Sequence, residues 1–421
     1  MRDHRAEDRI EKVLAAPAEL LSPAGDEEAL LAALRYGADA VYLGAKSFGM
    51  RAKAANFELD SLEGAAALAH KYGARLYLAC NTLPRGRELD ELPEFIRAAA
   101  RAGVDGLIVS DLGVLALAKH LEPELEIHIS TQFGVVNYLT ARQLYEMGAS
   151  RVVLARELTL EEIAEIRQKT PPQLCLEAFV HGAMCVSVSG RCVISNYLTG
   201  RDANRGECAQ PCRWDYALME RSRPGQYLPA YEEDGYSFLL NANDLCMIEH
   251  LDKLTAAGVG SLKIEGRAKS AYYVAAVTGA YRKALDILAE EGEGYTLPQW
   301  LLNEVEKISH RPYSTGFYLR GSPPDEDRVR GGYRRTWQLV ASVDGWENGY
   351  ILCTERNRFA LGEQLEALTP EGPPVSLTVG EILDEEGQPI EVARHPMMKV
   401  RIKSELRLPA GAMLRREQTQ D

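Results

Sequence analysis

Residues 75–111 read RLYLACNTLPRGRELDELPEFIRAAARAGVDGLIVSD, and this stretch decides how most of the chain folds. It begins with an apolar run (RLYLAC), continues with an amphipathic segment typical of a helix, and ends with a second apolar run (GLIVS). Gly103 follows the helical segment, where a glycine can adopt the left-handed conformation that ends a helix. Apolar runs without alternation are typical of strands buried on both faces, so the stretch predicts two parallel strands joined by a helix.

The same unit recurs between residue 19 and about residue 290. Eight apolar runs separated by helical segments lie in this range: ELLSPAG (19–25), AVYLGA (40–45), RLYLACNT (75–82), GLIVSD (106–111), EIHISTQ (126–132), RVVLARE (151–157), LCLEAFV (174–180) and SLKIEGR (261–267). Eight repeats predict an α/β fold, a (β/α)8 TIM-like barrel, with a doubly wound parallel sheet as the alternative. A ninth candidate strand, SFLLNAND (237–244), is assigned to a long insertion at about 181–260.

The C-terminal part of the chain has a different pattern. After about residue 330, short alternating apolar runs are separated by turn sequences such as DG, EG and PAG. This pattern predicts a small antiparallel β-barrel domain. We therefore expect two domains, residues 1–325 with the insertion and residues 326–421, joined near RGSPPDEDRVRGGYRR (320–335).

Composition and charge narrow the class of protein. The formal net charge of -13 argues against indiscriminate nucleic-acid binding, although an acidic protein can still carry a local basic surface. No run of about 18 apolar residues occurs, so no membrane span is expected. Residues 1–25 are charged and lack the apolar core of a secretory signal, which predicts a cytoplasmic protein whose thiols stay reduced.

Five of the eight cysteines lie close together in the sequence, among glycine, proline and polar residues. They are Cys185, Cys192, Cys208, Cys212 and Cys246. The other three lie in apolar or β runs and are interpreted as packed thiols: Cys80, Cys175 and Cys353. An iron–sulfur cluster accepts four thiolates at any spacing, whereas structural zinc prefers close pairs such as Cys208 and Cys212. A nucleophilic cysteine near His181, and packed or redox thiols, are further alternatives.

The sequence around the first two of these cysteines, EAFVHGAMCVSVSGRCVIS (177–195), resembles the signature of peptidase family U32, the collagenase-like proteases. The stretches GRDANRGECAQPCR (200–213), SLKIEGR and HRPYSTGFY (310–318) are similar to further blocks of that family, so the resemblance covers nearly the whole chain. Members of the family resemble one another in being oxygen-independent hydroxylation factors with a [4Fe-4S] cluster. They act on tRNA, on ribosomal RNA or on ubiquinone precursors.

The resemblance also implies a substrate and a set of site residues. With its length and its C-terminal β domain, the chain is most similar to the tRNA hydroxylation branch, which implies 5-hydroxyuridine at the wobble position and prephenate as hydroxyl donor. The implied cluster ligands are Cys185, Cys192, Cys208 and Cys246, with Cys212 as the alternative to Cys208. His181 is our candidate for a catalytic, proton-handling or donor-binding role. Candidate anchors for the anionic donor are Arg191, Arg205, Arg213, Lys263 and Arg267.

Residues 310–337 offer a candidate contact with RNA, because arginines alternate there with aromatic side chains. The alternative is a solvated linker whose aromatic side chains pack at the domain junction. Two other functions compete with a tRNA hydroxylase: a collagenase-like U32 peptidase, and a non-enzymatic metal-containing RNA-binding protein. No HExxH or GxSxG motif supports the peptidase. A homologous partner protein is compatible with each of these functions.

Overall fold

The structure of the 421-residue chain is a computed structural model. It describes residues 17–49, 56–184, 194–201, 207–211, 218–219, 227–228, 230–233, 236–239, 243–319 and 333–418.

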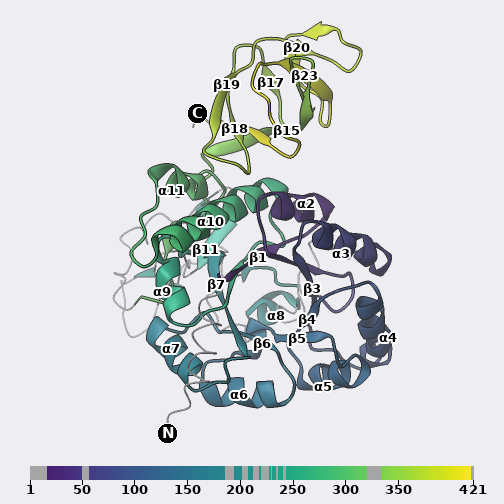
Figure 1. Cartoon of the computed structure of the whole chain (residues 1–421), viewed down its shortest axis with the longest axis vertical. Helices are drawn as coiled ribbons and strands as arrows, with labels where there is room; N and C mark the ends of the chain where they lie inside the picture. Colours follow the sequence, from purple (N-terminus) through teal and green to yellow (C-terminus); the bar gives the residue numbers. More distant parts are fainter. Residues whose placement is uncertain are drawn as a thin grey trace.

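Eight parallel strands form a closed barrel (Figure 1), which confirms the predicted (β/α)8 fold and excludes the doubly wound sheet. The barrel strands are β1 (Glu19–Pro23), β2 (Ala40–Gly44), β3 (Arg75–Cys80), β4 (Gly106–Val109), β5 (Glu126–Ile129), β6 (Arg151–Val153), β7 (Cys175–Gly182) and β13 (Ser261–Ile264). Strands β1 to β7 pair in chain order, and β13 pairs in parallel with both β1 and β7. The last strand therefore closes the ring, and each of the eight predicted apolar runs supplies one strand.

Helices surround the barrel on the outside (Figure 1). They are α2 (Glu27–Arg35), α3 (Leu62–Lys71), α4 (Glu88–Arg101), α5 (Leu112–Leu121), α6 (Tyr138–Glu146), α7 (Leu160–Gln168), α9 (Leu251–Ala256) and α10 (Ala271–Glu291). Asp26, Asp111 and Ser270 each precede a helix and accept a hydrogen bond from a backbone N–H of its first turn. The buried faces of these helices and the outer faces of the strands form one large apolar core, as their sequence patterns require. Cys80 belongs to this core, as predicted.

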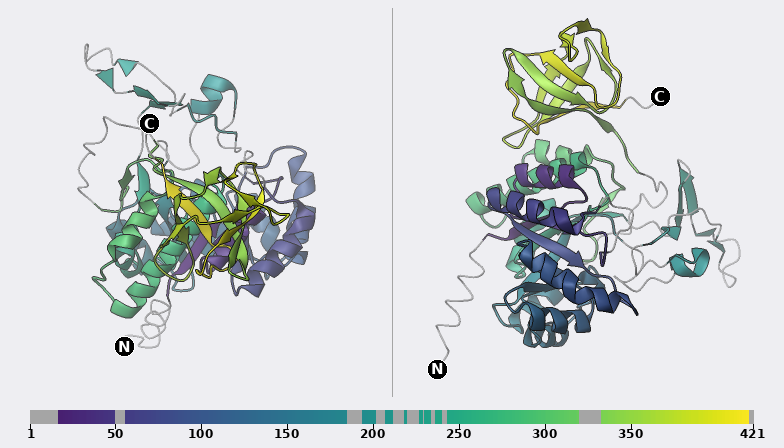
Figure 2. Two further views of the ribbon diagram at one scale, coloured as in Figure 1. Left: turned by 90° about the horizontal axis from the view of Figure 1, so that it is seen from above. Right: turned by 90° about the vertical axis from the view of Figure 1, so that its right-hand side faces the viewer.

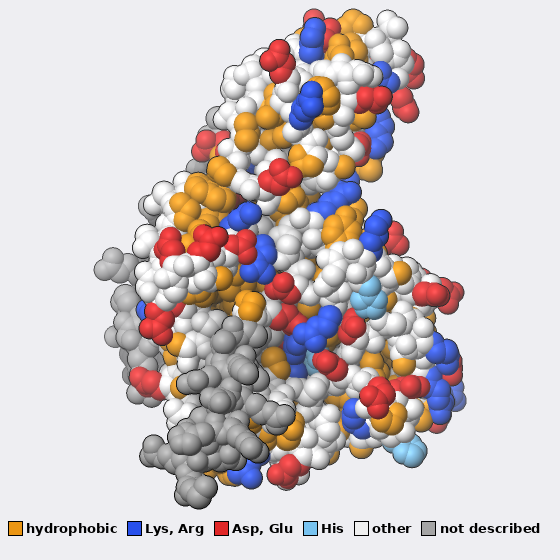
Figure 3. Space-filling model, viewed as in Figure 1, with side chains coloured by type: hydrophobic (Ala, Val, Ile, Leu, Met, Phe, Trp, Pro, Cys, Tyr) orange, Lys and Arg blue, Asp and Glu red, His pale blue; other side chains and the backbone are white. Residues whose placement is uncertain are grey.

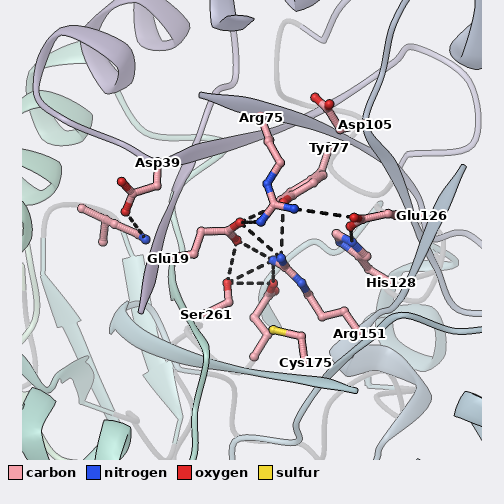
Figure 4. A network of polar contacts seen from close by, with 12 residues as sticks. Glu19, Asp39, Arg75, Tyr77, Asp105, Glu126, His128, Arg151, Cys175 and Ser261 are labelled. Atoms are coloured by element: carbon pink, nitrogen blue, oxygen red, sulfur yellow. Dashed lines mark hydrogen bonds and ion pairs between the residues drawn. The ribbon is translucent and has the colours of Figure 1, made fainter. Parts of the chain in front are cut away.

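The interior of the barrel holds a small apolar layer and, beside it, a network of charges (Figure 4). Arg151 of β6 lies at the centre of the network, where its Nη1 is 2.5 Å from Oε1 of Glu19 and 2.8 Å from Oε2 of Glu177. Nη1 also donates to the Ser261 hydroxyl at 3.1 Å, and Nη2 donates to the Tyr77 hydroxyl at 3.3 Å. Four strands besides β6 are thus joined across the barrel through one guanidinium group.

Burial and the neighbouring positive charges shift the pKa of Glu19 in opposite directions in this network. Burial raises the pKa of Glu19, but the Arg151 charge and hydrogen bond, together with the Arg75 charge, outweigh it and lower the pKa to about 2. His128 lies nearby with no side-chain exposure, and burial lowers its pKa to about 4. At neutral pH the network therefore contains ionised carboxylates, charged arginines and a neutral imidazole.

The long insertion leaves the barrel after β7 and returns at β12 (Asp244–Cys246). Its described elements include α8 (Ile194–Thr199), β8 (Leu218–Met219), β9 (Tyr227–Leu228) and the antiparallel pair β10 (Ala230–Glu233) and β11 (Tyr236–Leu239). Figure 2 shows these elements on one side of the barrel. The described part of the ninth candidate strand falls in two elements of the insertion. Residues 237–239 lie in β11, which pairs with β10, and Asp244 is the first residue of β12, which pairs with β7.

The C-terminal domain is antiparallel, as predicted. Its eight-stranded sheet has the order β19 (Val375–Thr378), β18 (Gln364–Leu368), β24 (Met413–Glu417), β15 (Trp337–Glu347), β16 (Tyr350–Glu355), β23 (Lys399–Lys403), β20 (Ile382–Leu383) and β21 (Pro389–Ile390). The sheet curls into a half-barrel around its own apolar core, with the short pair β17 (Phe359–Ala360) and β22 (Val392–Ala393) beside it. Cys353 is 1% exposed in that core, which confirms it as a packed thiol.

A buried polar junction joins the two domains. Arg415 of β24 has no exposed side-chain surface and donates to both carboxylate oxygens of Glu304 on α11 (Gln299–Glu306), at 2.6 and 2.7 Å. Its Nε donates to Glu366 of β18 at 2.8 Å, and Lys307 donates to the same carboxylate at 2.8 Å. The Trp337 ring lies 4.6 Å from Lys307 Nζ. Directional contacts of this kind fix how the C-terminal domain sits on the barrel.

Two surface properties follow from the described residues. None of their helices is long and apolar enough to cross a membrane. On the face shown in Figure 3, Lys and Arg side chains are interspersed with Asp and Glu over both domains.

Candidate functional site

The candidate site lies at the end of the barrel that carries the C-terminal ends of the parallel strands. Strand β7 extends beyond the other barrel strands, and its last residues pair in antiparallel orientation with β12, so that Cys246 lies opposite His181. Strand β12 in turn pairs in parallel with β14 (Tyr313–Ser314). The end of β7 together with β12 and β14 forms what we call the lip. The lip brings together three segments that are far apart in the sequence.

His181 is buried in the lip among aromatic rings. It is 1% exposed, its Nδ1 lies 3.4 Å from the Tyr281 hydroxyl, and its Nε2 lies 3.4 Å from the Tyr313 hydroxyl. The Tyr273 ring is 6.1 Å from the imidazole ring. Burial lowers the pKa of His181 to about 3, so the imidazole is neutral at physiological pH. A proton-handling role for His181 stays a prediction.

Two of the predicted metal ligands, Cys208 and Cys246, belong to the described residues. Cys246 is half-buried, with its Sγ 3.9 Å from the Tyr281 hydroxyl, and burial raises the pKa of its thiol to about 12. Cys208 is half-buried, and its Sγ accepts a hydrogen bond from the backbone N–H of Gln210 at 3.3 Å. Among the described residues, no three His, Cys, Asp or Glu side chains gather into a metal site. The remaining cysteines of the group lie outside the described residues: Cys185, Cys192 and Cys212.

The described thiols also bear on the peptidase hypothesis. Burial raises the pKa of Cys80 and Cys246 to about 12 and that of Cys175 to about 11. A nucleophilic cysteine needs a lowered pKa, because the thiolate is the reactive form. The environments of these three cysteines therefore do not suit a cysteine peptidase.

Lys263 lies inside the barrel, where it forms an ion pair with a carboxylate that it shares with Arg151. Its Nζ is 2.7 Å from Oε1 of Glu177, and the two side chains are 5% and 1% exposed. The same ammonium group lies 4.4 Å from the centre of the Tyr42 ring and 5.5 Å from that of Phe179. These contacts hold the Lys263 ammonium group in one position.

Arg267, the second described donor anchor, lies over strand β2. It is 5% exposed, and its Nη1 comes so close to the backbone that a Cβ at Gly44 would lie 1.9 Å from it. Only a glycine leaves space for this guanidinium group. The other predicted anchors lie outside the described residues: Arg191, Arg205 and Arg213.

Sequence reasoning did not select a third cation at the mouth, Arg156. Its guanidinium lies 3.9 Å from the centre of the Phe179 ring, donates to the Ala183 carbonyl at 2.7 Å, and pairs with Glu265 at 3.2 Å. Its position at the end of the run RVVLARE was the available signal, since active sites of such barrels form at these strand ends.

The predicted RNA contact in residues 310–337 is only partly described. Arg311 is 2% exposed and pairs with Asp244, and Tyr318 is 3% exposed and donates to the Phe179 carbonyl at 2.7 Å. Neither can contact RNA at the surface, so the expectation is wrong for these two residues. Phe317, by contrast, is 54% exposed. Trp337 lies at the domain junction, as the alternative interpretation expected for the aromatic side chains.

Comparison with known proteins identifies the family. Residues 25–328 match peptidase family U32, and residues 335–415 match the C-terminal domain of peptidase family U32. This chain belongs to peptidase family U32.

Several relatives of this U32 protein have been named for what they do. It is 36% identical to "tRNA hydroxylation protein P1" of Bacillus subtilis, with 96% of each chain covered. It is 34% identical to "tRNA hydroxylation protein P" of Escherichia coli, with 89% of this chain and 91% of the relative covered. It is also 39% identical to "23S rRNA 5-hydroxycytidine C2501 synthase" of Escherichia coli, with 73% of this chain but only 46% of that protein covered.

Proposed function

We propose that this U32 protein hydroxylates tRNA, converting the wobble uridine to 5-hydroxyuridine. The observation that carries the proposal is the length of the similarity: both relatives named as tRNA hydroxylation proteins match over about nine-tenths or more of their chains, through barrel and C-terminal domain alike. The relative that acts on ribosomal RNA is matched over less than half of its length. RNA hydroxylation is thus the activity supported by all three relatives, and tRNA is the substrate supported by the two that match over about nine-tenths or more of their length.

We further propose a [4Fe-4S] cluster held by Cys185, Cys192, Cys208 and Cys246. The described part of this set fits such a group. Sulfur donors suit iron, and the Cys208 sulfur already accepts a backbone N–H hydrogen bond of the kind that supports a thiolate. Burial raises the pKa of the Cys246 thiol, so a metal ion bound there would replace the thiol proton. When bound, the cluster supplies redox chemistry, which hydroxylation of uracil C5 requires beyond acid–base catalysis.

We propose that the hydroxyl donor is the anion prephenate and that cations of the barrel attract it. Glu177 holds Lys263 in a fixed position, and Arg267 is packed closely against Gly44. These two side chains therefore need little further ordering when a carboxylate binds. Their low exposure keeps water from the charges, which strengthens the attraction for the donor. Arg191, Arg205 and Arg213 follow in the insertion as further candidates for the donor or for tRNA phosphates.

His181 is neutral, and among the described residues its two ring nitrogens lie 3.4 Å from the Tyr281 and Tyr313 hydroxyls. We propose that it orders this hydrogen-bonded group beside Cys246, with proton handling as its predicted role.

The function is tested by nucleoside analysis of tRNA from a strain that lacks this protein and any paralogue. We expect 5-hydroxyuridine and the nucleosides derived from it to disappear, and to return when the gene is restored. Unchanged nucleosides in the deletion strain would overturn the tRNA assignment. The metal is tested separately by anaerobic purification: about four irons per chain support the cluster, whereas a colourless protein with one zinc favours a non-enzymatic RNA-binding protein.

A further inference from the structure

A buried ion pair lies at the base of the lip and has no part in the chemistry proposed above. Nε of Arg311 donates to Oδ1 of Asp244 at 2.9 Å, and Nη2 lies 2.7 Å from the same oxygen. The backbone N–H of Arg311 donates to Oδ2 of Asp244 at 3.1 Å. The two side chains are 2% and 3% exposed. The pair is therefore fixed by several bonds and shielded from solvent.

This ion pair joins the two chain segments that lead into predicted metal ligands. Nη2 of Arg311 also donates to the Met184 carbonyl at 3.3 Å, and Cys185 is the next residue in the sequence. Asp244 is the first residue of β12, and Cys246 is its third. One guanidinium group thus contacts the residue before one predicted ligand and the strand that carries another.

The surrounding contacts leave the two segments little freedom to shift. Gly316 has a φ of +58°, and a Cβ there would lie 3.2 Å from Leu245 and 3.6 Å from the Met184 side chain. Leu245 is 1% exposed. One residue earlier than Met184, the Ala183 carbonyl accepts a hydrogen bond from Arg156 at 2.7 Å. Two guanidinium groups therefore fix the two consecutive backbone carbonyls that directly precede Cys185 in the sequence.

Stability alone does not account for an ion pair in this position. Removing two charges from water offsets most of their attraction, and apolar residues of similar volume often hold a fold equally well. An arginine adds direction, because its planar group places its partners at fixed angles that a lysine does not impose. Arg311 uses this geometry on Asp244 and on Met184 at once, so its specific contribution is the spacing between their segments.

We propose that Arg311 is a positioning residue for the metal centre, setting the distance between Cys246 and the segment that leads into Cys185. The proposal rests on the proposed function, because it requires these cysteines to bind the metal. Arg311 contributes no donor atom; it acts through the two backbones. Residues that orient metal ligands in this way typically change metal affinity about 10- to 100-fold when they are replaced.

The test compares Arg311→Lys with Arg415→Lys in the full chain, both purified anaerobically and reconstituted with iron and sulfide. Arg415 is a matched control, since it is also buried and is bonded to two carboxylates. It lies at the domain junction, and among the described residues it bonds to no segment that carries a predicted metal ligand. For each protein we would measure iron and sulfide per chain, the rate of iron release to a chelator, and the Tm. Asp244→Asn, with Glu304→Gln as its control, gives a second pair of variants in case a lysine at position 311 prevents folding.

We expect Arg311→Lys and Asp244→Asn to release iron at least about tenfold faster than their controls, even where the paired variants lose Tm equally. Iron release at the rate of the controls would overturn the positioning role, because a purely structural pair would affect the Tm and leave metal retention unchanged. Wild-type protein that binds no iron after reconstitution would overturn the proposed cluster itself, and with it this inference. The wild-type iron content thus separates the two failures.

Discussion

Replacing Arg151 by methionine tests whether the charge network inside the barrel holds the fold together. Methionine keeps the apolar part of the side chain but leaves Glu19 and Glu177, which are 10% and 1% exposed, without the guanidinium between them. Breaking a buried ion pair by removing one partner costs about 3–5 kcal/mol, because a charge stays buried without compensation. Glu177 keeps its bond to Lys263, so we expect the lower part of this range.

The free energy of unfolding would be measured by urea denaturation, with Arg101→Met as the control. Arg101 pairs with Glu94 on the surface, where the side chains are 62% and 68% exposed. Pairs of that kind contribute about 0–1 kcal/mol. A loss of about 3 kcal/mol in Arg151→Met against less than about 1 kcal/mol in the control supports the account. Equal losses in the two variants would refute it, since burial would then add nothing to the contribution of the pair.

Two further predictions concern Gly44 and Glu19. Gly44→Ala places a Cβ where Nη1 of Arg267 now lies and so displaces the guanidinium group. We expect kcat/KM for the donor to fall on the order of 10²-fold, measured by nucleoside mass spectrometry. The control is Gly64→Ala, where a Cβ has open space, and it should have wild-type activity. The pKa of Glu19 is lowered from 4.5 to about 2, so its contribution to stability is fully present above pH 4.5 and is lost as the pH falls toward 2. Urea unfolding at pH 6 and pH 3 should show a smaller loss in Glu19→Gln than in wild type, and equal losses would contradict the assignment.

The barrel could be predicted from the sequence because its physical cause is local. Each strand is buried on both faces, so each appears as a continuous apolar run, and the glycines that follow the helices mark where those helices end. Eight such runs predict the eight-stranded barrel, whatever side chains fill its interior. The C-terminal sheet was predictable for a similar reason, since its alternating runs and turn sequences are local as well.

The contents of the site depend on contacts that no local pattern encodes. Arg311 and Asp244 are 67 residues apart and pair only because β12 and β14 meet at the lip. The sequence shows the charge of Arg311 but not its pairing with Asp244, so it places Arg311 among the candidate contacts for RNA. His181 was selected by its place at a strand end, but its burial among tyrosines comes from α10 and β14. Arg151 opens an apolar run, and only the register of the barrel turns it inward.

The proposed hydroxylation of tRNA by this U32 protein depends on the proposed cysteine-bound cluster. The most direct test restores the deletion strain with Cys246→Ser or with Cys353→Ser, and measures 5-hydroxyuridine-derived nucleosides in the tRNA by mass spectrometry. Cys353 is a buried thiol of the C-terminal core and serves as the control. We expect Cys353→Ser to restore the modified nucleosides and Cys246→Ser to restore none, with both proteins present at similar levels in the cell. Full restoration by Cys246→Ser would contradict the account.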